Sequence, residues 1–310
     1  MKSVSVIDGQ AFWGCSALKS VDLPNVTSIG DFAFAYCSNL ESVNLPKVTS
    51  IGKGAFSYTS ILEVSLPATL QSLSNDNFYG AGKIVLASTT PPVMPSGTYF
   101  SCLGVILVPE ASLEVYRNAD GWKYAAGQIW SQSEVIDYDM PTTAQENTSG
   151  LHNVIGDDCL AKVVSLKVTG TINGYDIMVI RNKMPNLHYL DLTDATIVAN
   201  DFEYYTGCHT EDNIIGDYMF ASLSKLVSIK LPKNATRIGG NALYYCSSLV
   251  EVVLPIKLEE IGNNAFFYCT NLRSIDFPPT LKTIDDSAFY YCIYNHRTTK
   301  TNQKYPSVNL

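Results

Sequence analysis

The stretch IGNNAFFYCTNLRSIDFP, residues 261–278, decides the fold, because close variants of it recur along most of the 310-residue chain. In the C-terminal half the copies are 23 residues apart and start at Ile215, Ile238, Ile261 and Ile284. In the N-terminal half they are 22 residues apart and start at Ile7, Ile29 and Ile51. A unit this short cannot bury its own apolar side and must stack on its neighbours. The repeat therefore predicts a solenoid.

One copy contains two kinds of local pattern. Leu272, Ile275 and Phe277 form an L-x-x-I-x-F run, in which Ile275 and Phe277 alternate with Ser274 and Asp276. This alternation predicts a short strand with the first pair inward and the second pair outward. The preceding apolar residues recur at spacings of three and four, as on one face of a helical turn: Ala265, Phe266, Cys269 and Leu272. A second short extended piece is expected at Ile261.

The pattern I-G-x-x-A-F-x-x-C-x-x-L-x-x-V-x-L-P resembles the BspA-like leucine-rich repeats of bacterial surface proteins. The resemblance covers most of the chain, although Thr59 replaces the cysteine and Leu243 the phenylalanine in single copies. It implies an α/β leucine-rich repeat solenoid, β-rich with short helical turns, in two tandem segments. It also implies a secreted or cell-surface location and adhesion to host or matrix proteins.

Composition limits the possible partners. The chain is 46% hydrophobic and carries a formal net charge of −8, which argues against binding a nucleic-acid backbone. The longest apolar run, residues 103–108, is far shorter than the roughly 20 residues of a membrane helix. The chain enters repeat sequence almost at once, so we expect no signal peptide within it.

Five of the eight cysteines share one slot of the repeat, namely Cys15, Cys37, Cys246, Cys269 and Cys292. A small, weakly polar side chain at a stacked position predicts a ladder of buried thiols, not disulfides. Cys102, Cys159 and Cys208 lie outside this slot and receive no role.

Loss of the period divides the chain. Residues 1–137 are predicted as a first solenoid whose end is covered by a cap at 83–137. The cap includes a helix from about Ser112, with Leu113, Tyr116 and Ala119 along one face. Residues 138–149 are polar, contain proline and lack an apolar period, which predicts a linker.

Residues 150–310 are predicted as a second solenoid, with an N-terminal cap region at 150–196. This region contains a short helix, residues 176–184, for which Asp176 suits the N-cap. An insertion, residues 196–213, precedes the regular repeats.

Catalytic and metal-binding motifs are missing from the sequence. No zinc-protease, nucleophile-elbow or phosphate-loop spacing occurs, and the histidines are isolated: His152, His188, His209 and His296. His209 with Cys208, Glu211 and Asp212 is the one cluster that could hold a metal. Its spacing fits no known template, so a solvated loop is the better interpretation. We expect no cofactor and no enzyme activity.

A row of tyrosines precedes the cysteine slot, at Tyr36, Tyr58, Tyr245, Tyr268 and Tyr291. Such rings could stack on sugars. Their recurrence at one repeat position favours packing between turns instead, because binding residues should vary.

The outward residues of the strands do vary between turns. In the second solenoid they are Ser228, Lys230, Glu251, Val253, Ser274 and Asp276, and in the first Ser20, Asp22, Ser42, Asn44, Glu63 and Ser65. Solenoids present extended sheet faces to large ligands. The sequence therefore predicts a non-enzymatic protein that binds a protein or a glycan at the strand face of the second solenoid. A structural spacer of a larger surface protein is the alternative.

Overall fold

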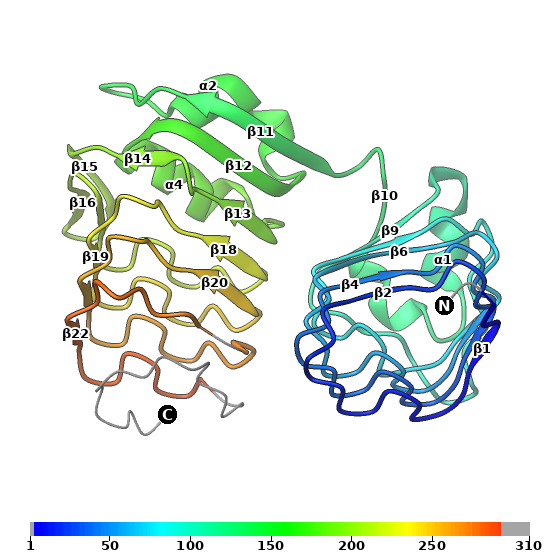
Figure 1. Cartoon of the computed structure of the whole chain (residues 1–310). Helices are drawn as coiled ribbons and strands as arrows, with labels where there is room; N and C mark the ends of the chain where they lie inside the picture. Colours follow the sequence, from blue (N-terminus) through cyan, green and yellow to red (C-terminus); the bar gives the residue numbers. More distant parts are fainter. Residues whose placement is uncertain (1–2, 274, 293–310) are drawn as a thin grey trace. The chain divides into compact units, whose positions relative to one another are not determined.

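The computed structural model describes residues 3–273 and 275–292 of a β-rich α/β solenoid of stacked repeats, as predicted (Figure 1). The chain forms two compact units, Met1–Val135 and Ile136–Leu310. Each unit has its own core of buried side chains. The exact domain limits stay a prediction, and the two units are treated separately below.

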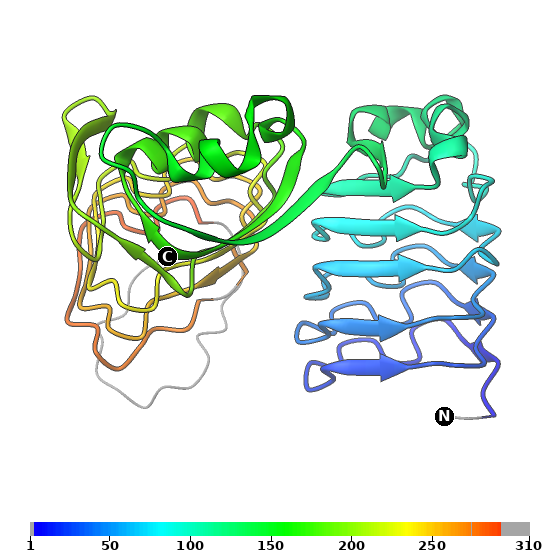
Figure 2. The ribbon, with the colours of Figure 1, turned by 90° about the horizontal axis from the view of Figure 1, so that it is seen from above.

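Parallel strands run along two sides of the first unit. One ladder contains the two-residue strands β1 (Val6–Ile7), β3 (Ser28–Ile29), β5 (Ser50–Ile51) and β7 (Ser72–Leu73). The other side carries the pair β2 (Ser20–Asp22) and β4 (Ser42–Asn44), then the sheet β6 (Glu63–Leu66), β8 (Lys83–Leu86), β9 (Val105–Val108) and β10 (Ile129–Ser131). Figure 2 shows these longer strands stacked one above another. Equivalent residues of successive turns pair directly, as Ile29 does with Ile51.

Strands such as β2 and β6 alternate between solvent and core as the sequence predicts, whereas all four residues of β9 are buried. In β6, Glu63 and Ser65 are exposed, whereas Val64 and Leu66 are buried. Successive side chains of a strand point to opposite faces, so the apolar set enters the core.

The segment between the two strands of a repeat differs in detail from the expected helical turn. Asn264 and Tyr268 have positive φ values of 54° and 61°. The N–H groups of Asn264, Phe266 and Tyr268 donate to carbonyl groups of the next turn, at 3.2, 2.7 and 2.9 Å. The N–H groups of the intervening residues instead donate to carbonyl groups of the same repeat and close reverse turns, as Phe267 N–H does to the Asn264 carbonyl. A left-handed residue at every fourth position lets alternate N–H groups reach the neighbouring turn, which a helix would not allow.

A helical cap covers the last turn of the first unit; the limits 83–137 given for it stay a prediction. It consists of η1 (Glu110–Ser112), α1 (Leu113–Asn118) and η2 (Lys123–Gln128), which lie over the end of the strand stack in Figure 2. Tyr116 is fully buried, and Leu113 and Ala119 pack against the core. The expected apolar face of this helix is therefore correct.

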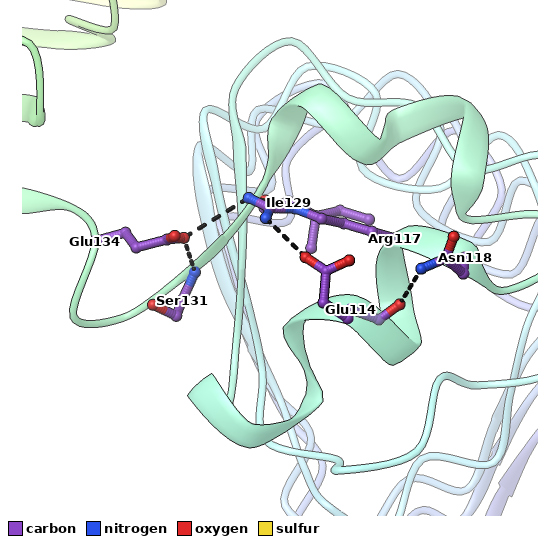
Figure 3. Close-up of polar contacts among 6 residues, drawn as sticks. All are labelled: Glu114, Arg117, Asn118, Ile129, Ser131 and Glu134. Carbon is purple, nitrogen blue, oxygen red and sulfur yellow. Dashed lines mark hydrogen bonds and ion pairs between the residues drawn. The ribbon is translucent and has the colours of Figure 1, made fainter.

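Arg117 fastens the cap to the last strand (Figure 3). Its Nε and Nη2 donate to the carbonyl of Ile129 at 3.1 and 2.8 Å, and its Nη1 contacts Glu114 at 3.2 Å. Glu134 lies 3.7 Å from Nη2 and accepts the N–H of Ser131 at 2.9 Å. These contacts hold α1, β10 and the following turn together.

The second unit begins with a region of strands and helices that precedes its regular repeats. Its main sheet has the order β11 (Ile136–Thr142), β12 (Val163–Ile172), β13 (Tyr189–Asp191), β18 (Ser228–Lys230) and β20 (Glu251–Val253), and β14 (Ala195–Ile197) also pairs with β12. The helices are α2 (Gly150–Ile155), α3 (Asp157–Leu160) and α4 (Gly174–Lys183). The two-residue ladder contains β17 (Ile214–Ile215), β19 (Arg237–Ile238), β21 (Glu260–Ile261) and β22 (Thr283–Ile284). The predicted insertion forms a hairpin of β15 (Asn200–Tyr205) and β16 (Cys208–Thr210).

Part of the predicted linker, residues 138–142, belongs to strand β11. Residues of β11 pair in parallel with β12, for example Asp139 with Lys167. β11 is the edge strand of its sheet, where polar side chains and a proline such as Pro141 are tolerated. The polar composition therefore reflects an edge strand over these residues.

The sequence suggested Asp176 as the N-cap of helix α4, but the N-cap is Asn173. The helix begins at Gly174 after Asn173, and Asp176 completes a capping box as the third helical residue. The Asp176 carboxylate is fully buried and also accepts hydrogen bonds from Ser149 Oγ and Leu151 N, at 2.7 and 2.9 Å. It therefore joins the start of α2 to the start of α4.

The predicted cysteine ladder is present in the core. Each thiol donates to a carbonyl of the preceding turn: Cys37 to Phe12, Cys246 to Phe220, Cys269 to Leu243 and Cys292 to Phe266, at 3.0–3.3 Å. Cys37, Cys246 and Cys269 are buried, and Cys292 is half-buried. Cys15 is exposed, so its predicted burial is wrong. No described turn lies on its N-terminal side to cover it.

We expect these thiols to differ in reactivity by position along the stack. Burial raises the pKa of Cys246 to about 12, so at pH 8 this thiol carries almost no reactive thiolate. A maleimide added to the native protein at pH 8 should label Cys15 quickly and Cys37, Cys246 and Cys269 only after unfolding. Peptide mass spectrometry of labelled samples checks this. Rapid native labelling of Cys246 would contradict the burial of the ladder.

Candidate functional site

The outward face of the second unit's main sheet aligns four charged side chains and one valine from five strands. The strand register places these residues side by side in the order Asp139, Lys167, Asp191, Lys230 and Val253. Their chain neighbours Leu166, Leu190 and Ile229 are buried, so the aligned set faces away from the core. We call these five residues the outer row.

Opposite charges alternate along the outer row. Lys167 Nζ lies 3.0 Å from Asp139 Oδ2, and Lys230 Nζ lies 3.2 Å from Asp191 Oδ2. The hydrogen bond and charge of Asp139 raise the pKa of Lys167. Partial burial acts to raise the pKa of Asp191, but hydrogen bonds from Thr193 and Lys230 outweigh it and hold that pKa below its usual range. At neutral pH the row is therefore charged and locally compensated.

The predicted site residues differ in their exposure to solvent. Lys230, Val253 and Asp276 are exposed and Glu251 is half-buried. Ser274 lies outside the described residues.

Ser228 is buried, so its expected exposure is wrong. Its Oγ donates to Glu251 Oε2 at 2.6 Å, and the register places it between Tyr189 and Glu251. Larger side chains on both adjacent strands therefore cover this small residue.

Sequence reasoning missed Asp139, Lys167 and Asp191 as members of the same face. The alternation in residues 163–172 and 189–192 carried the signal, but residue 139 was assigned to the linker. Their shared row depends on pairing between β11, β12 and β13, which the chain order does not reveal.

In the first unit, the predicted outward residues are exposed: Ser20, Asp22, Ser42, Asn44, Glu63 and Ser65. Asn44 donates to Asp22 at 2.7 Å, directly across β2 and β4. Of these six residues, only Asp22 and Glu63 are charged.

The predicted tyrosine row forms a ladder of stacked rings. Ring centroids are 4.6 Å apart for Tyr36 and Tyr58 and 4.5 Å apart for Tyr245 and Tyr268, with nearly parallel planes. Tyr291 meets Tyr268 edge-on at 5.7 Å. A stacked neighbour covers at least one face of Tyr36, Tyr58, Tyr245 and Tyr268, although Tyr58 and Tyr291 are still 61% and 50% exposed. Sugar stacking needs an open ring face, so packing between turns is the better interpretation.

The two histidines His209 and His188 have different surroundings. His209 contacts Glu203 at 4.0 Å and the carbonyl of Asp201 at 2.8 Å. Within residues 3–273 and 275–292, no three histidine, cysteine, aspartate or glutamate side chains converge as metal ligands would. His188 is buried, which lowers its pKa to about 4 and keeps it neutral at physiological pH. In the same described part of the chain, no helix is long and apolar enough to span a bilayer.

Comparison with known proteins identifies the repeat. A family profile described as "BspA type Leucine rich repeat region" matches residues 1–91 and 208–307, with six copies. These two ranges make up more than half of the chain. No curated protein matches the sequence.

Solved structures similar to the chain include a leucine-rich repeat protein from Bacteroides ovatus ATCC 8483. It is 20% identical, with 94% of this chain and 80% of that chain covered and a TM-score of 0.30. A leucine-rich repeat protein from Eubacterium ventriosum ATCC 27560 is 17% identical, with 92% and 86% covered and a TM-score of 0.29. A leucine rich cell surface protein from Faecalibacterium prausnitzii A2-165 is 21% identical, with 92% and 54% covered and a TM-score of 0.25.

Proposed function

Because the chain belongs to the BspA-type leucine-rich repeat family, we propose that it is a non-enzymatic, cell-surface or secreted protein that binds a partner protein. The binding site is the strand face of the second unit, around Lys230, Glu251, Val253 and Asp276. The observation that carries this proposal is the outer row, which displays side chains of differing charge and size on one continuous sheet.

The physical character of this face suits a protein surface. Paired aspartates and lysines keep its charge balanced, which gives no advantage to a polyanion such as nucleic acid. Backbone pairing with neighbouring strands fixes the main chain that carries each side chain, so little backbone ordering entropy is lost on binding. The host or matrix protein expected from the family is the first partner to test, and a glycan is the second.

The test is a screen of the full chain against extracellular-protein and glycan arrays, followed by substitution of the face. Lys230→Ser combined with Val253→Ser should weaken binding of the selected partner at least tenfold. The stability of the protein should change by less than about 1 kcal/mol, because exposed ion pairs contribute little. Binding is measured by biolayer interferometry and stability by urea titration.

Lys282→Ser is the matched control. Lys282 also forms an exposed ion pair, 2.6 Å from Glu259, but it lies beside the two-residue strand ladder and outside the outer row. Its substitution should leave binding unchanged. Equal losses from both variants would contradict a site at the outer row.

A structural spacer is the second candidate, and the compensated charges favour it. Lys167 and Lys230 already have acidic partners within the face, so they do not require an external one. A spacer would bind nothing on either array.

A further inference from the structure

A groove lies at the cap of the first unit. It lies between the loop 91–99, which follows β8, and the segment 119–124, which joins α1 to η2. Its volume is about 920 Å³, a size typical of sites for small ligands. The loop contains Pro91, Pro92 and Pro95, which restrict its backbone.

The floor of the groove is rigid. Trp122 is fully buried, and its Nε1 donates to the carbonyl of Pro92 at 2.9 Å. The Trp122 ring stacks on Phe100 at 4.9 Å and meets Tyr116 edge-on at 5.4 Å. Gly121 has a φ of 82°, and a side chain there would meet Met94 within 3 Å. Contacts within the protein therefore hold both loops against each other.

Two tyrosines at the rim of the groove are exposed to solvent. Tyr99 and Tyr124 are 57% and 72% exposed, and their ring centroids lie 5.7 Å apart with planes tilted by 56°. Because the two rings are tilted, they do not cover each other as fully as rings in a parallel stack do. Lys123 Nζ lies 5.8 Å from the centre of the Tyr124 ring, yet most of Tyr124 remains exposed to solvent. Open aromatic faces are thus available here.

Polar groups lie beside these rings and carry no net charge. Asp120 and Lys123 pair at 2.9 Å, and their side chains are 98% and 49% exposed. Thr98 donates its hydroxyl to Pro95, which leaves its oxygen able to accept. The rim therefore offers hydrogen-bond donors and acceptors next to apolar ring faces, with balanced charge.

We propose that this groove binds a neutral oligosaccharide. A pyranose ring has apolar C–H faces that fit open tyrosine rings, and its hydroxyl groups both donate and accept at the edges. The balanced pair Asp120–Lys123 matches a ligand without charge. This site lies in the first unit and is independent of the protein-binding face proposed for the second.

A proline-rich peptide is the competing occupant, because such peptides also use aromatic grooves. They gain affinity from an accessible indole N–H that donates to a peptide carbonyl. Here the Trp122 N–H is buried and already bonded to Pro92. The geometry thus favours the sugar.

Affinity electrophoresis of the full chain tests the proposal. At least one of four polysaccharides in a native gel should retard the protein: glycogen, galactomannan, xyloglucan or hydroxyethyl cellulose. Calorimetry with a hexasaccharide of the same linkage should then give a dissociation constant. Tyr99→Ala and Tyr124→Ala should each weaken that binding at least tenfold. The matched control is Tyr79→Ala, which removes a 49% exposed tyrosine outside the groove.

An unchanged tryptophan fluorescence transition on urea titration verifies that the variants keep the first unit, which contains Trp122, folded. Lys230→Ser should leave saccharide binding unchanged, which separates this site from the strand face. The proposal is overturned if no polysaccharide retards the protein, or if the double variant Tyr99→Ala/Tyr124→Ala binds as well as the parent. Binding of decaproline in place of saccharides, lost in the same double variant, would also overturn it and assign the groove to peptides.

Discussion

Replacing Phe266 with alanine is expected to lower the free energy of unfolding of the second unit by about 3–5 kcal/mol. Phe266 is fully buried, and its ring stacks on Phe289 of the next turn at 4.9 Å. Backbone hydrogen bonds between turns, such as that from Phe266 N to Ala288 O at 2.7 Å, hold the neighbouring turns at a fixed spacing. The resulting cavity can therefore collapse little, which places the loss in the upper part of the usual range.

The tryptophan distribution allows this effect to be assigned to one unit. Trp13, Trp122 and Trp130 are the chain's three tryptophans, and all lie in the first unit. In a urea titration of Phe266→Ala, the circular dichroism transition of the second unit should move to lower urea while the tryptophan fluorescence transition stays in place. Tyr268→Ala, at a half-buried ladder position, should have a smaller effect. Equal, small shifts for both variants would mean that the inward and outward positions are wrongly assigned.

Replacing Gly104 with alanine is expected to destabilise the first unit by about 3 kcal/mol, the upper end of the range for overpacking. A Cβ at this position would lie 1.8 Å from the carbonyl oxygen of Gly82 and 2.3 Å from its Cα. The obstacle is backbone, which pairs here with the adjacent turn through Val105 N and Gly82 O at 2.9 Å. Relief therefore requires the two turns to separate and lose hydrogen bonds. The tryptophan fluorescence transition should move to lower urea in this variant.

Gly127→Ala is the matched control, because a Cβ there would meet nothing within 4 Å. Its effect should stay within about 0.5 kcal/mol. A Gly104→Ala protein as stable as this control would show that the turns of the first unit can separate without loss.

The repeat period in the sequence was sufficient to predict the stacking and most of the core. Phe34, Cys37 and Leu40 are fully buried, as their recurring slots indicate. Slot and burial agree because identical local sequences adopt identical turns, and each turn covers the one before it. The alternation Glu63, Val64, Ser65, Leu66 likewise predicted which side chains face solvent.

Positions at the edges and between distant strands required the tertiary structure. Cys15 shares the local sequence of Cys37 but is exposed, because burial in a stack depends on whether another turn lies alongside. Residue 139 looked like linker until the pairing of β11 with β12 placed it beside Lys167. The groove of the first unit, with Tyr99 and Tyr124 at its rim, comes from segments more than twenty residues apart. The sequence by itself thus determined the contacts that repeat with its period. The tertiary structure decided those that occur once, because they depend on which non-equivalent segments happen to meet.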